Sequence, residues 1–130
     1  MLEINFASEE FPPVLPDECQ GNPGTYGFEL LFWLAQALMA KGIVTSYPGQ
    51  EDWGWYIEQS GDSEYMIGCS PVDENSDGRP LEWRLFVKNM AWAGWFKSKR
   101  PVASDTGATA LMSAIVACLA ERGIQATSID

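Results

Sequence analysis

Apolar and polar side chains alternate at several places along the chain, and the strongest alternation runs over residues 53–58. There Trp53, Trp55 and the next apolar residue alternate with glycine, tyrosine and glutamate, the period of a strand with one buried face. Because two indoles supply a large apolar area, we expect Trp53 and Trp55 to share the buried face of a strand in mid-sheet. The acids Glu51 and Asp52, directly before the run, mark the point where the chain leaves solvent.

The same period and the positions of turn residues predict five further strands. In chain order they cover residues 2–6, 43–47, 65–70, 82–88 and about 124–129. Pro48-Gly49 is expected to form the turn after the second of these. Short polar turns separate the three strands in the middle of the chain, so we expect an antiparallel meander there.

Apolar residues at helical spacing predict a first helix from about residue 23 to Lys41. Asn22 is a suitable N-cap, Pro23 fits the first helical position and Gly42 is a C-terminal stop. The residues expected on its core face are Gly27, Leu30, Leu31, Leu34, Ala35 and Leu38. Glu29 and Gln36 lie opposite and should be solvated.

Phe32 and Trp33 fall on that same solvated side of the first helix and flank Glu29. Two neighbouring aromatics beside a polar stripe indicate a covered surface. Either the long loop before the helix folds over them, or they form a contact with a subunit or partner.

A second helix is predicted to begin after Pro101, with Ser104 or Asp105 as N-cap, and to end at Arg122-Gly123. Its core stripe consists of Leu111, Ile115, Cys118 and Leu119. Its other side carries small uncharged residues, namely Thr109, Ala110, Ser113, Ala117 and Ala120. Small side chains allow close packing, on the first helix or across a subunit boundary.

These elements follow one another in the order β-α-β-β-β-β-α-β, which predicts one α+β domain over residues 1–130. We expect a two-layer sandwich resembling the ferredoxin-like arrangement. A mainly antiparallel sheet of five to six strands would carry two helices on one face. The order of the strands within the sheet stays open.

The charge balance limits the classes of partner. Eighteen Asp and Glu residues against eight Lys and Arg residues give the chain a net charge of −10. Because such a surface repels phosphates, nucleic-acid binding is not expected. A basic protein partner would suit this charge, and so would solubility alone. Four of the eight basic residues fall between Lys88 and Arg100, which predicts one cationic patch.

We expect a cytoplasmic protein that makes no membrane contact. No apolar run reaches the length needed to span a bilayer, and residues 1–6 alternate like a strand, unlike a signal peptide. The three cysteines, Cys19, Cys69 and Cys118, are odd in number and lack metal-like spacing. This indicates free thiols in a reducing compartment.

The composition offers little catalytic chemistry. The chain has no histidine, which removes the side chain best suited to acid–base work near neutral pH and the usual partner of a nucleophile. Cys69, in mid-strand, is interpreted as a buried inert thiol. Carboxylate catalysis by Glu51 and Asp52 stays open, although adjacent acids at strand ends are usually solvated. No phosphate-binding glycine loop or paired-cysteine site is present, and no cofactor is expected.

One polar loop matches the start of a calcium-binding loop. Asp73, Asn75 and Asp77 occupy the first, third and fifth positions, and Gly78 the sixth. The twelfth position, however, is Arg84 where a bidentate glutamate belongs. Asn, Asp and Gly also favour turns for local reasons, so we interpret the loop as a turn.

Two functional hypotheses remain. The first is a non-enzymatic interaction protein that self-associates or binds a partner through Phe32, Trp33 and the small-residue side of the second helix. The alternative is a small-ligand pocket, or a carboxylate-based enzyme, built from the segment Glu51-Asp52-Trp53-Gly54-Trp55. In a pocket the indoles would hold a cationic or aromatic ligand by stacking and cation–π contact.

A resemblance adds to the first hypothesis. The motifs that carry it are Phe11-Pro12-Pro13, Asn22-Pro23-Gly24 and Glu51-Asp52-Trp53-Gly54-Trp55. Over residues 11–59 the chain resembles small acidic bacterial proteins carried on mobile gene cassettes of the integron kind, some of which resemble immunity proteins beside toxin genes. The resemblance implies a bacterial protein with an immunity-like or accessory role, and the net charge of −10 makes a basic protein the expected partner. It implies no catalytic residues.

Overall fold

A computed structural model of the chain describes residues 2–12, 14, 19, 26–59, 65–74, 80–90 and 106–128. Its elements are β1 (Leu2–Ala7), α1 (Phe28–Met39), β2 (Gly49–Glu51), β3 (Gly54–Glu58), β4 (Tyr65–Glu74), β5 (Pro80–Asn89), α2 (Thr106–Glu121) and β6 (Ala126–Ser128). This is the predicted order of strands and helices. The predicted α+β class, with two helices and one antiparallel sheet of six strands, is confirmed.

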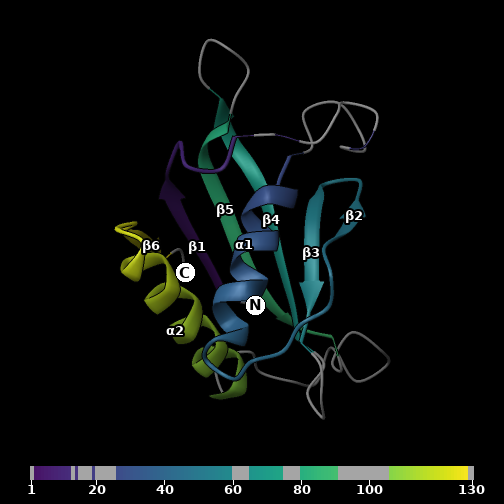
Figure 1. Cartoon of the computed structure of the whole chain (residues 1–130), viewed down its shortest axis with the longest axis vertical. Helices are drawn as coiled ribbons and strands as arrows, with labels where there is room; N and C mark the ends of the chain where they lie inside the picture. The colour runs from purple at the N-terminus through teal and green to yellow at the C-terminus, as the bar shows by residue number, and fades with distance from the viewer. Residues whose placement is uncertain are drawn as a thin grey trace.

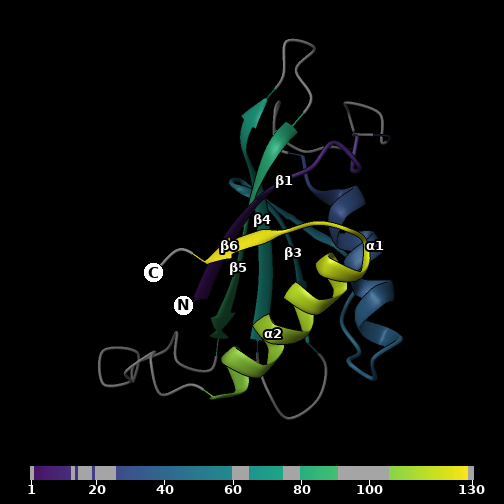
Figure 2. The ribbon, with the colours of Figure 1, turned by 90° about the vertical axis from the view of Figure 1, so that its left-hand side faces the viewer.

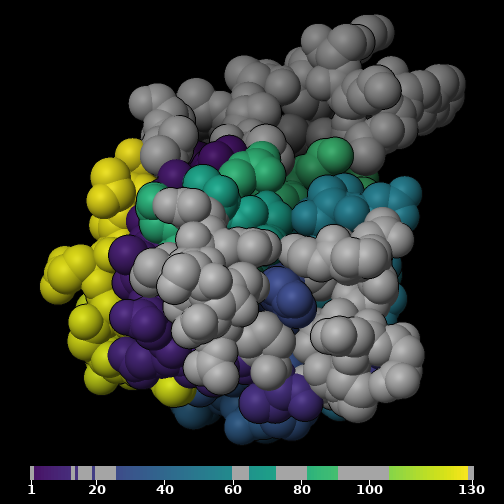
Figure 3. Space-filling model, turned by 90° about the horizontal axis from the view of Figure 1, so that it is seen from above, coloured from purple at the N-terminus to yellow at the C-terminus, as the bar shows by residue number. Residues whose placement is uncertain are grey.

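The strands lie in the order β2-β3-β4-β5-β1-β6, and every neighbouring pair is antiparallel. The predicted meander of three strands is therefore present as β3-β4-β5, β2 extends it by one strand, and β1 lies between β5 and β6. Both helices cover the same face of the sheet (Figures 1 and 2). Helix α1 packs on β3, and α2 packs on β5, β1 and β6. Seen from above, the N-terminal strand lies directly beside the C-terminal elements (Figure 3).

The core fills the space between the sheet and the two helices. Both predicted helix stripes point into it, because Leu30, Leu31, Leu34 and Leu38 of α1 and Leu111, Ile115, Cys118 and Leu119 of α2 are buried. The sheet contributes Ile4, Phe6, Trp55, Ile57, Ile67, Cys69, Trp83, Leu85 and Val87. Each large aliphatic or aromatic side chain buried in this way stabilises the fold by roughly 1.5–3 kcal/mol.

Both helices end as predicted, and in the same way. Gly42 and Gly123 have φ values of 86° and 83°, in the left-handed region that glycine adopts readily. The N–H of Ile43 donates to the carbonyl of Leu38 at 2.9 Å, and Ile124 repeats this bond to its own helix, also at 2.9 Å. The chain turns sharply back to the sheet after each helix.

The first helix begins later than predicted, at Phe28 in place of residue 23. Tyr26 and Gly27 precede it in non-helical conformation, and Gly27 has a φ of 149°. A side chain at Gly27 would collide with Cys69, whose Sγ lies 2.7 Å from the ideal Cβ position. Close approach of the backbone to the sheet therefore requires glycine here. The predicted caps Asn22, Ser104 and Asp105 lie outside the described residues.

The prediction that Trp53 and Trp55 share a buried face is wrong. Strand β3 begins only at Gly54, and Trp53 lies in the turn that joins it to β2. Trp55 is 4% exposed and faces the helices, whereas Trp53 is 39% exposed. The Trp53 ring lies on the opposite face of the sheet, 5.2 Å from the ring of Phe86. Side chains point to alternate faces only within a strand. Trp53 does not follow this alternation because it lies in the turn before β3.

The strand predicted over residues 43–47 is also wrong. Only Thr45 forms a bridge there, to Gln59, and β2 occupies residues 49–51, where a turn was expected. The pairing with β3 shifts by one residue within this segment. Thr45 pairs with Gln59 and Gly49 with Tyr56, so four residue steps on one strand face three on the other. The extra residue forms a bulge near Pro48, which has no N–H for a ladder.

Other predicted segments are only partly described. Strand β6 covers residues 126–128 in place of the predicted 124–129, and residue 129 lies outside the described part. The calcium-like loop has its first residue in β4 and its twelfth in β5. Its central residues 75–79 are not described, so its interpretation as a turn stays a prediction. The predicted cationic patch lies mostly in residues 91–100, which are not described either.

Candidate functional site

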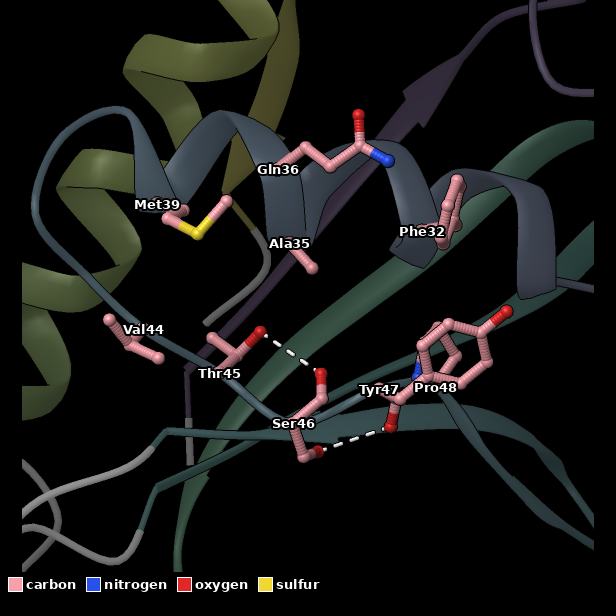
Figure 4. A pocket seen from close by; sticks show the side chains of 9 residues that line it. All are labelled: Phe32, Ala35, Gln36, Met39, Val44, Thr45, Ser46, Tyr47 and Pro48. Carbon is pink, nitrogen blue, oxygen red and sulfur yellow. Dashed lines mark hydrogen bonds between the residues drawn. The ribbon is translucent and has the colours of Figure 1, made fainter.

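A groove of about 180 Å³ lies between α1 and the segment that follows it. Its lining consists of Phe32, Ala35, Gln36, Met39, Val44, Thr45, Ser46, Tyr47 and Pro48. We call this the α1 groove. Phe32 and Tyr47 face each other at one end and Met39 and Val44 at the other, with Ala35 between them (Figure 4). The helical residues are three, four and seven positions apart, which places them on one side of α1.

The α1 groove gathers large apolar side chains that water reaches. Phe32 is 40% exposed, Met39 58%, Val44 53% and Tyr47 69%. Eight large hydrophobic side chains are exposed among the described residues, and these four are half of them. Single exposed hydrophobic residues are normal, but a contiguous group of this kind marks an interaction surface.

An aromatic cluster forms one end of the α1 groove and connects it to the core. The ring of Phe28 stacks on Phe32 at 5.5 Å, and it meets Tyr47 at 5.8 Å and Trp55 at 5.4 Å. Phe32 and Tyr47 also meet edge to face at 5.8 Å. Because Trp55 is buried beneath α1, this end of the groove rests on a fixed base.

Trp33, next to Phe32 in the sequence, is not part of the α1 groove. The ring of Phe11 lies 5.4 Å from its ring, and the Arg122 guanidinium lies over both rings, 4.9 Å from that of Phe11 and 5.0 Å from that of Trp33. Arg122 also forms an ion pair with Glu10 at 2.7 Å. The structure therefore separates the two aromatics that the helical wheel grouped: one is covered and the other is open.

The chain before α1 also reaches Glu29, which the helical wheel predicted to be solvated. The N–H of Val14 donates to Oε2 of Glu29 at 2.8 Å, and Glu29 is half-buried. Gln36, the other residue predicted to be solvated, is exposed. The outer side of α1 is thus covered at its N-terminal part and open further along.

The side chains proposed for ligand binding or catalysis do not meet at one site. Glu51 and Asp52 are exposed at the end of β2 and in the turn after it, Trp53 lies on the open face of the sheet, and Trp55 lies beneath α1. None of these four residues lines the α1 groove or the second hollow described next.

A second hollow of about 610 Å³ lies between α2 and the edge of β1. Its lining consists of Leu2, Glu3, Ile4, Thr109, Met112, Ser113, Val116 and Ser128. Thr109 and Ser113 belong to the small-residue side of α2, and both are exposed. That side does not pack on α1 at these positions, so the first of the two packing arrangements expected for it is wrong there.

The buried thiols have the environment predicted for inert cysteines. Cys69 is fully buried and its Sγ donates to the carbonyl of Gly27 at 3.7 Å. Burial raises the pKa of the Cys69 thiol far above its usual range, and burial likewise raises the pKa of Cys118. Because the thiolate is the nucleophile, neither group is reactive near neutral pH.

Two further findings concern metals and membranes. Across the part of the chain that the structure describes, no three Cys, Asp or Glu residues come close enough to hold a metal ion together. Neither described helix is both long and apolar enough to cross a bilayer.

Comparison with known proteins does not extend these observations. The chain matches no protein-family model, no curated protein and no solved structure. The resemblance to cassette and immunity proteins therefore stays a prediction, and function has to be argued from this chain's own residues.

Sequence reasoning found Phe32 but missed the other exposed side chains of the α1 groove. Met39 had a usable signal, because it follows Phe32 by two helical turns and so lies on the same side. Val44 and Tyr47 had none. Both belong to the segment predicted as a strand, where alternation places Tyr47 on the same side as Thr45. No pattern in the sequence indicates that this segment lies beside α1.

Proposed function

We propose that this protein is a non-enzymatic binding module that holds a segment of another protein in the α1 groove. The observation that carries this proposal is the grouping of four exposed apolar side chains, Phe32, Met39, Val44 and Tyr47, around one groove. Burying such a group against a partner removes its apolar area from water, which is the main favourable term in protein association.

Charge supports a basic partner. The net charge is −10, and three acids are exposed on this side of the sheet: Glu51 on β2, Asp52 in the turn after it and Glu58 on β3. Three of the four basic residues in the described part of the chain are already in ion pairs: Lys41 with Glu121, Arg84 with Glu3 and Arg122 with Glu10. The more specific form of the proposal, which follows the resemblance, is an immunity-like or accessory role in a bacterial cytoplasm.

Self-association is a second proposal, carried by a different surface. The small residues of α2 are exposed beside the hollow of about 610 Å³, and Val116 adds an exposed apolar side chain there. Small side chains let two helices of neighbouring copies approach closely. Light scattering tests this: wild type should be a dimer or larger and Ser113→Arg a folded monomer. A monomeric wild type contradicts it.

The alternative function at Glu51-Asp52-Trp53-Gly54-Trp55 has less support. A stacking pocket needs both indoles on one side, and a carboxylate enzyme needs its acids in a cleft. Trp53 and Trp55 lie on opposite faces of the sheet, and Glu51 and Asp52 are exposed at its edge. A small-molecule thermal-shift screen that finds a ligand weakened by Asp52→Asn would favour this alternative.

A random peptide display library tests the binding function on the intact chain. Selected peptides should bind the Met39→Glu variant at least about tenfold more weakly than wild type, a loss of about 1.4 kcal/mol. The Val72→Glu variant should bind like wild type. Val72 is a matched control because it is 51% exposed and lies on β4, away from the α1 groove.

Binding should also weaken as salt rises, because the proposed partner is basic. Peptides that bind Met39→Glu as well as wild type would contradict the proposal. A library that yields no peptide at all would contradict it too.

A further inference from the structure

The segment that lines the α1 groove forms one edge of the described sheet. The Tyr47 carbonyl there accepts a hydrogen bond from the Ser46 hydroxyl at 3.2 Å (Figure 4), whereas the outward N–H groups of this segment meet no acceptor among the described residues. The N–H of Ser46 donates to the carbonyl of Glu58 at 2.8 Å, and the N–H of Glu58 donates to the Ser46 hydroxyl at 2.9 Å. In an antiparallel pair the peptide groups of successive residues point alternately toward and away from the partner strand. Those of Thr45 and Tyr47 therefore point outward.

No strand covers this edge in the described part of the chain. β2 and the segment before it are the last members of the sheet on this side, and no described residue accepts a hydrogen bond from the N–H of Thr45 or Tyr47. Further along the same edge the situation differs, because the Gln50 side chain donates to the carbonyl of Cys19 at 2.8 Å. The open stretch coincides with the α1 groove.

The side chains along this edge alternate in a way that suits an added strand. Thr45 and Tyr47 point to the helix side and line the α1 groove (Figure 4). A strand added beside them would lie about 4.8 Å further out. Every second side chain of that strand would point toward α1, between Phe32 and Met39. The groove therefore favours a strand with apolar residues at alternate positions.

The remaining side chains of an added strand would point to the opposite face, where the nearest charges among the described residues are acidic. Glu58 and Glu51 lie on that face, since Glu58 pairs with Met66 and Glu51 with Gly54. Both are exposed. The nearest described base on that face is Lys88, on β5, which is two strands further into the sheet. Lysine or arginine is favoured at these positions.

We infer that the α1 groove binds its partner by strand addition: an extended segment with alternating apolar and basic residues pairs along Thr45–Tyr47 and places its apolar side chains against α1. This inference rests on the proposed binding function and adds the mode of recognition and the chemistry of the partner. Main-chain hydrogen bonds hold the segment, the groove selects the apolar positions, and the acids select the basic ones.

A synthetic peptide, acetyl-Lys-Val-Lys-Val-Lys-Val-Lys-amide, tests the inference by isothermal titration calorimetry on the intact chain. Two derivatives carry N-methyl groups, one on the valine amides and the other on the lysine amides. Because alternate amides of a strand point to opposite edges, only one derivative blocks the edge that meets Thr45 and Tyr47. That derivative should bind at least about tenfold more weakly, and the other like the parent.

The derivative that loses affinity also reports orientation. Loss on valine methylation indicates an antiparallel added strand, and loss on lysine methylation a parallel one. Equal loss in both derivatives, or in neither, overturns strand addition, as does a parent peptide that does not bind at low salt. The peptide with glutamate in place of lysine should not bind. Binding as tight as that of the parent would overturn the basic chemistry.

Two variants of the protein complete the design. Thr45→Pro removes the outward N–H and leaves the bonds of Ser46 in place, so it should abolish peptide binding. The Val72→Glu variant, which leaves this edge and the α1 groove unchanged, should bind the peptide like wild type. If Thr45→Pro does not fold, the methylated peptides still decide. Binding that responds to Met39→Glu but to neither methylation overturns strand addition and leaves the binding function standing. Binding that ignores Met39→Glu overturns both.

Discussion

Phe32 and Trp33 are neighbours in the sequence, and the helical wheel places them on one side of α1, yet in the structure they contact different segments. Trp33 is enclosed by Phe11 and by Arg122, which is itself held by Glu10. Phe32 contacts the rings of Phe28 and Tyr47, and 40% of its surface is exposed to water. The cover over Trp33 comes from Phe11, in the segment that follows β1, and from Arg122, directly after α2.

A helical wheel shows which positions of one helix share a side. It does not show which other segments of the chain cover those positions. The apolar surface of Trp33 contributes to stability because distant segments bury it. The equally apolar surface of Phe32 stays available to a partner. Four measurements distinguish a covered Trp33 from an open Phe32.

Truncation of Trp33 should have the largest effect. Trp33→Ala removes the indole from beneath Phe11 and Arg122 and should lower the free energy of unfolding by about 2–3 kcal/mol. Phe32→Ala, its matched control, should cost only about 1 kcal/mol because its ring is partly solvated already. Urea unfolding followed by circular dichroism measures both. Equal losses would show that the two aromatics are equally covered in solution.

Removing the guanidinium should have an intermediate effect. Arg122→Ala loses the contacts with two rings and a half-exposed ion pair, for an expected cost of about 1–1.5 kcal/mol. In the background of Trp33→Ala the same substitution should cost about 0.5–1 kcal/mol less. A double-mutant cycle measures this coupling. Additive losses would mean that Arg122 does not act through Trp33.

The Cys69 thiol should make stability fall in alkaline solution. Burial raises its pKa above the ordinary value of 9.0, so the folded state keeps the proton while the unfolded state releases it. Stability is then unaffected below pH 9 and is lost as pH rises above it, by about 1 kcal/mol between pH 9 and pH 10.

Urea unfolding at those two pH values, with Cys69→Ala as reference, measures that loss. Because Cys69 lies in the core, Phe32→Ala and Trp33→Ala should lose as much as wild type. A wild type that tracks Cys69→Ala would contradict the prediction.

Truncation at the open side should have the smallest effect on stability. Tyr47 is 69% exposed, so Tyr47→Ala should change the free energy of unfolding by less than about 0.5 kcal/mol. The same variant should weaken peptides selected for the α1 groove, because it removes one wall. Thermal unfolding and calorimetry give the two values. A loss of stability like that of Trp33→Ala would show that the groove is closed in solution.

Much of the fold was predictable, because local patterns specify it. Leucines at positions 30, 31, 34 and 38 define the buried side of α1, and Gly42 and Gly123 define where both helices end. Short polar turns indicated the meander. What local patterns could not specify is the pairing of β1 with β5 and β6, since hydrophobic alternation says which face of a strand is buried but not which strand lies beside it.

The candidate site was less predictable, for two physical reasons. First, a turn interrupts alternation: Asp52 and Trp53 form the hairpin turn, so Trp53 and Trp55 end on opposite faces. Second, the α1 groove joins a helix to a segment shifted by a bulge near Pro48. Neither the shift nor the position of Tyr47 has a signature in a single sequence.

The place of β1 between β5 and β6 has a consequence for the order in which the molecule forms. The meander joins neighbours in sequence, so its strands can pair soon after they leave the ribosome. β1 is synthesised before any of them, yet its partners Leu85 and Ser128 lie in the second half of the chain. β1 can pair only after these partners have been made. Because the chain between them is long, bringing its ends together is slow. Of the six strands of this sheet, the one made earliest therefore has partners that are made late, and the apolar side of β1 lies without them until β5 has been synthesised.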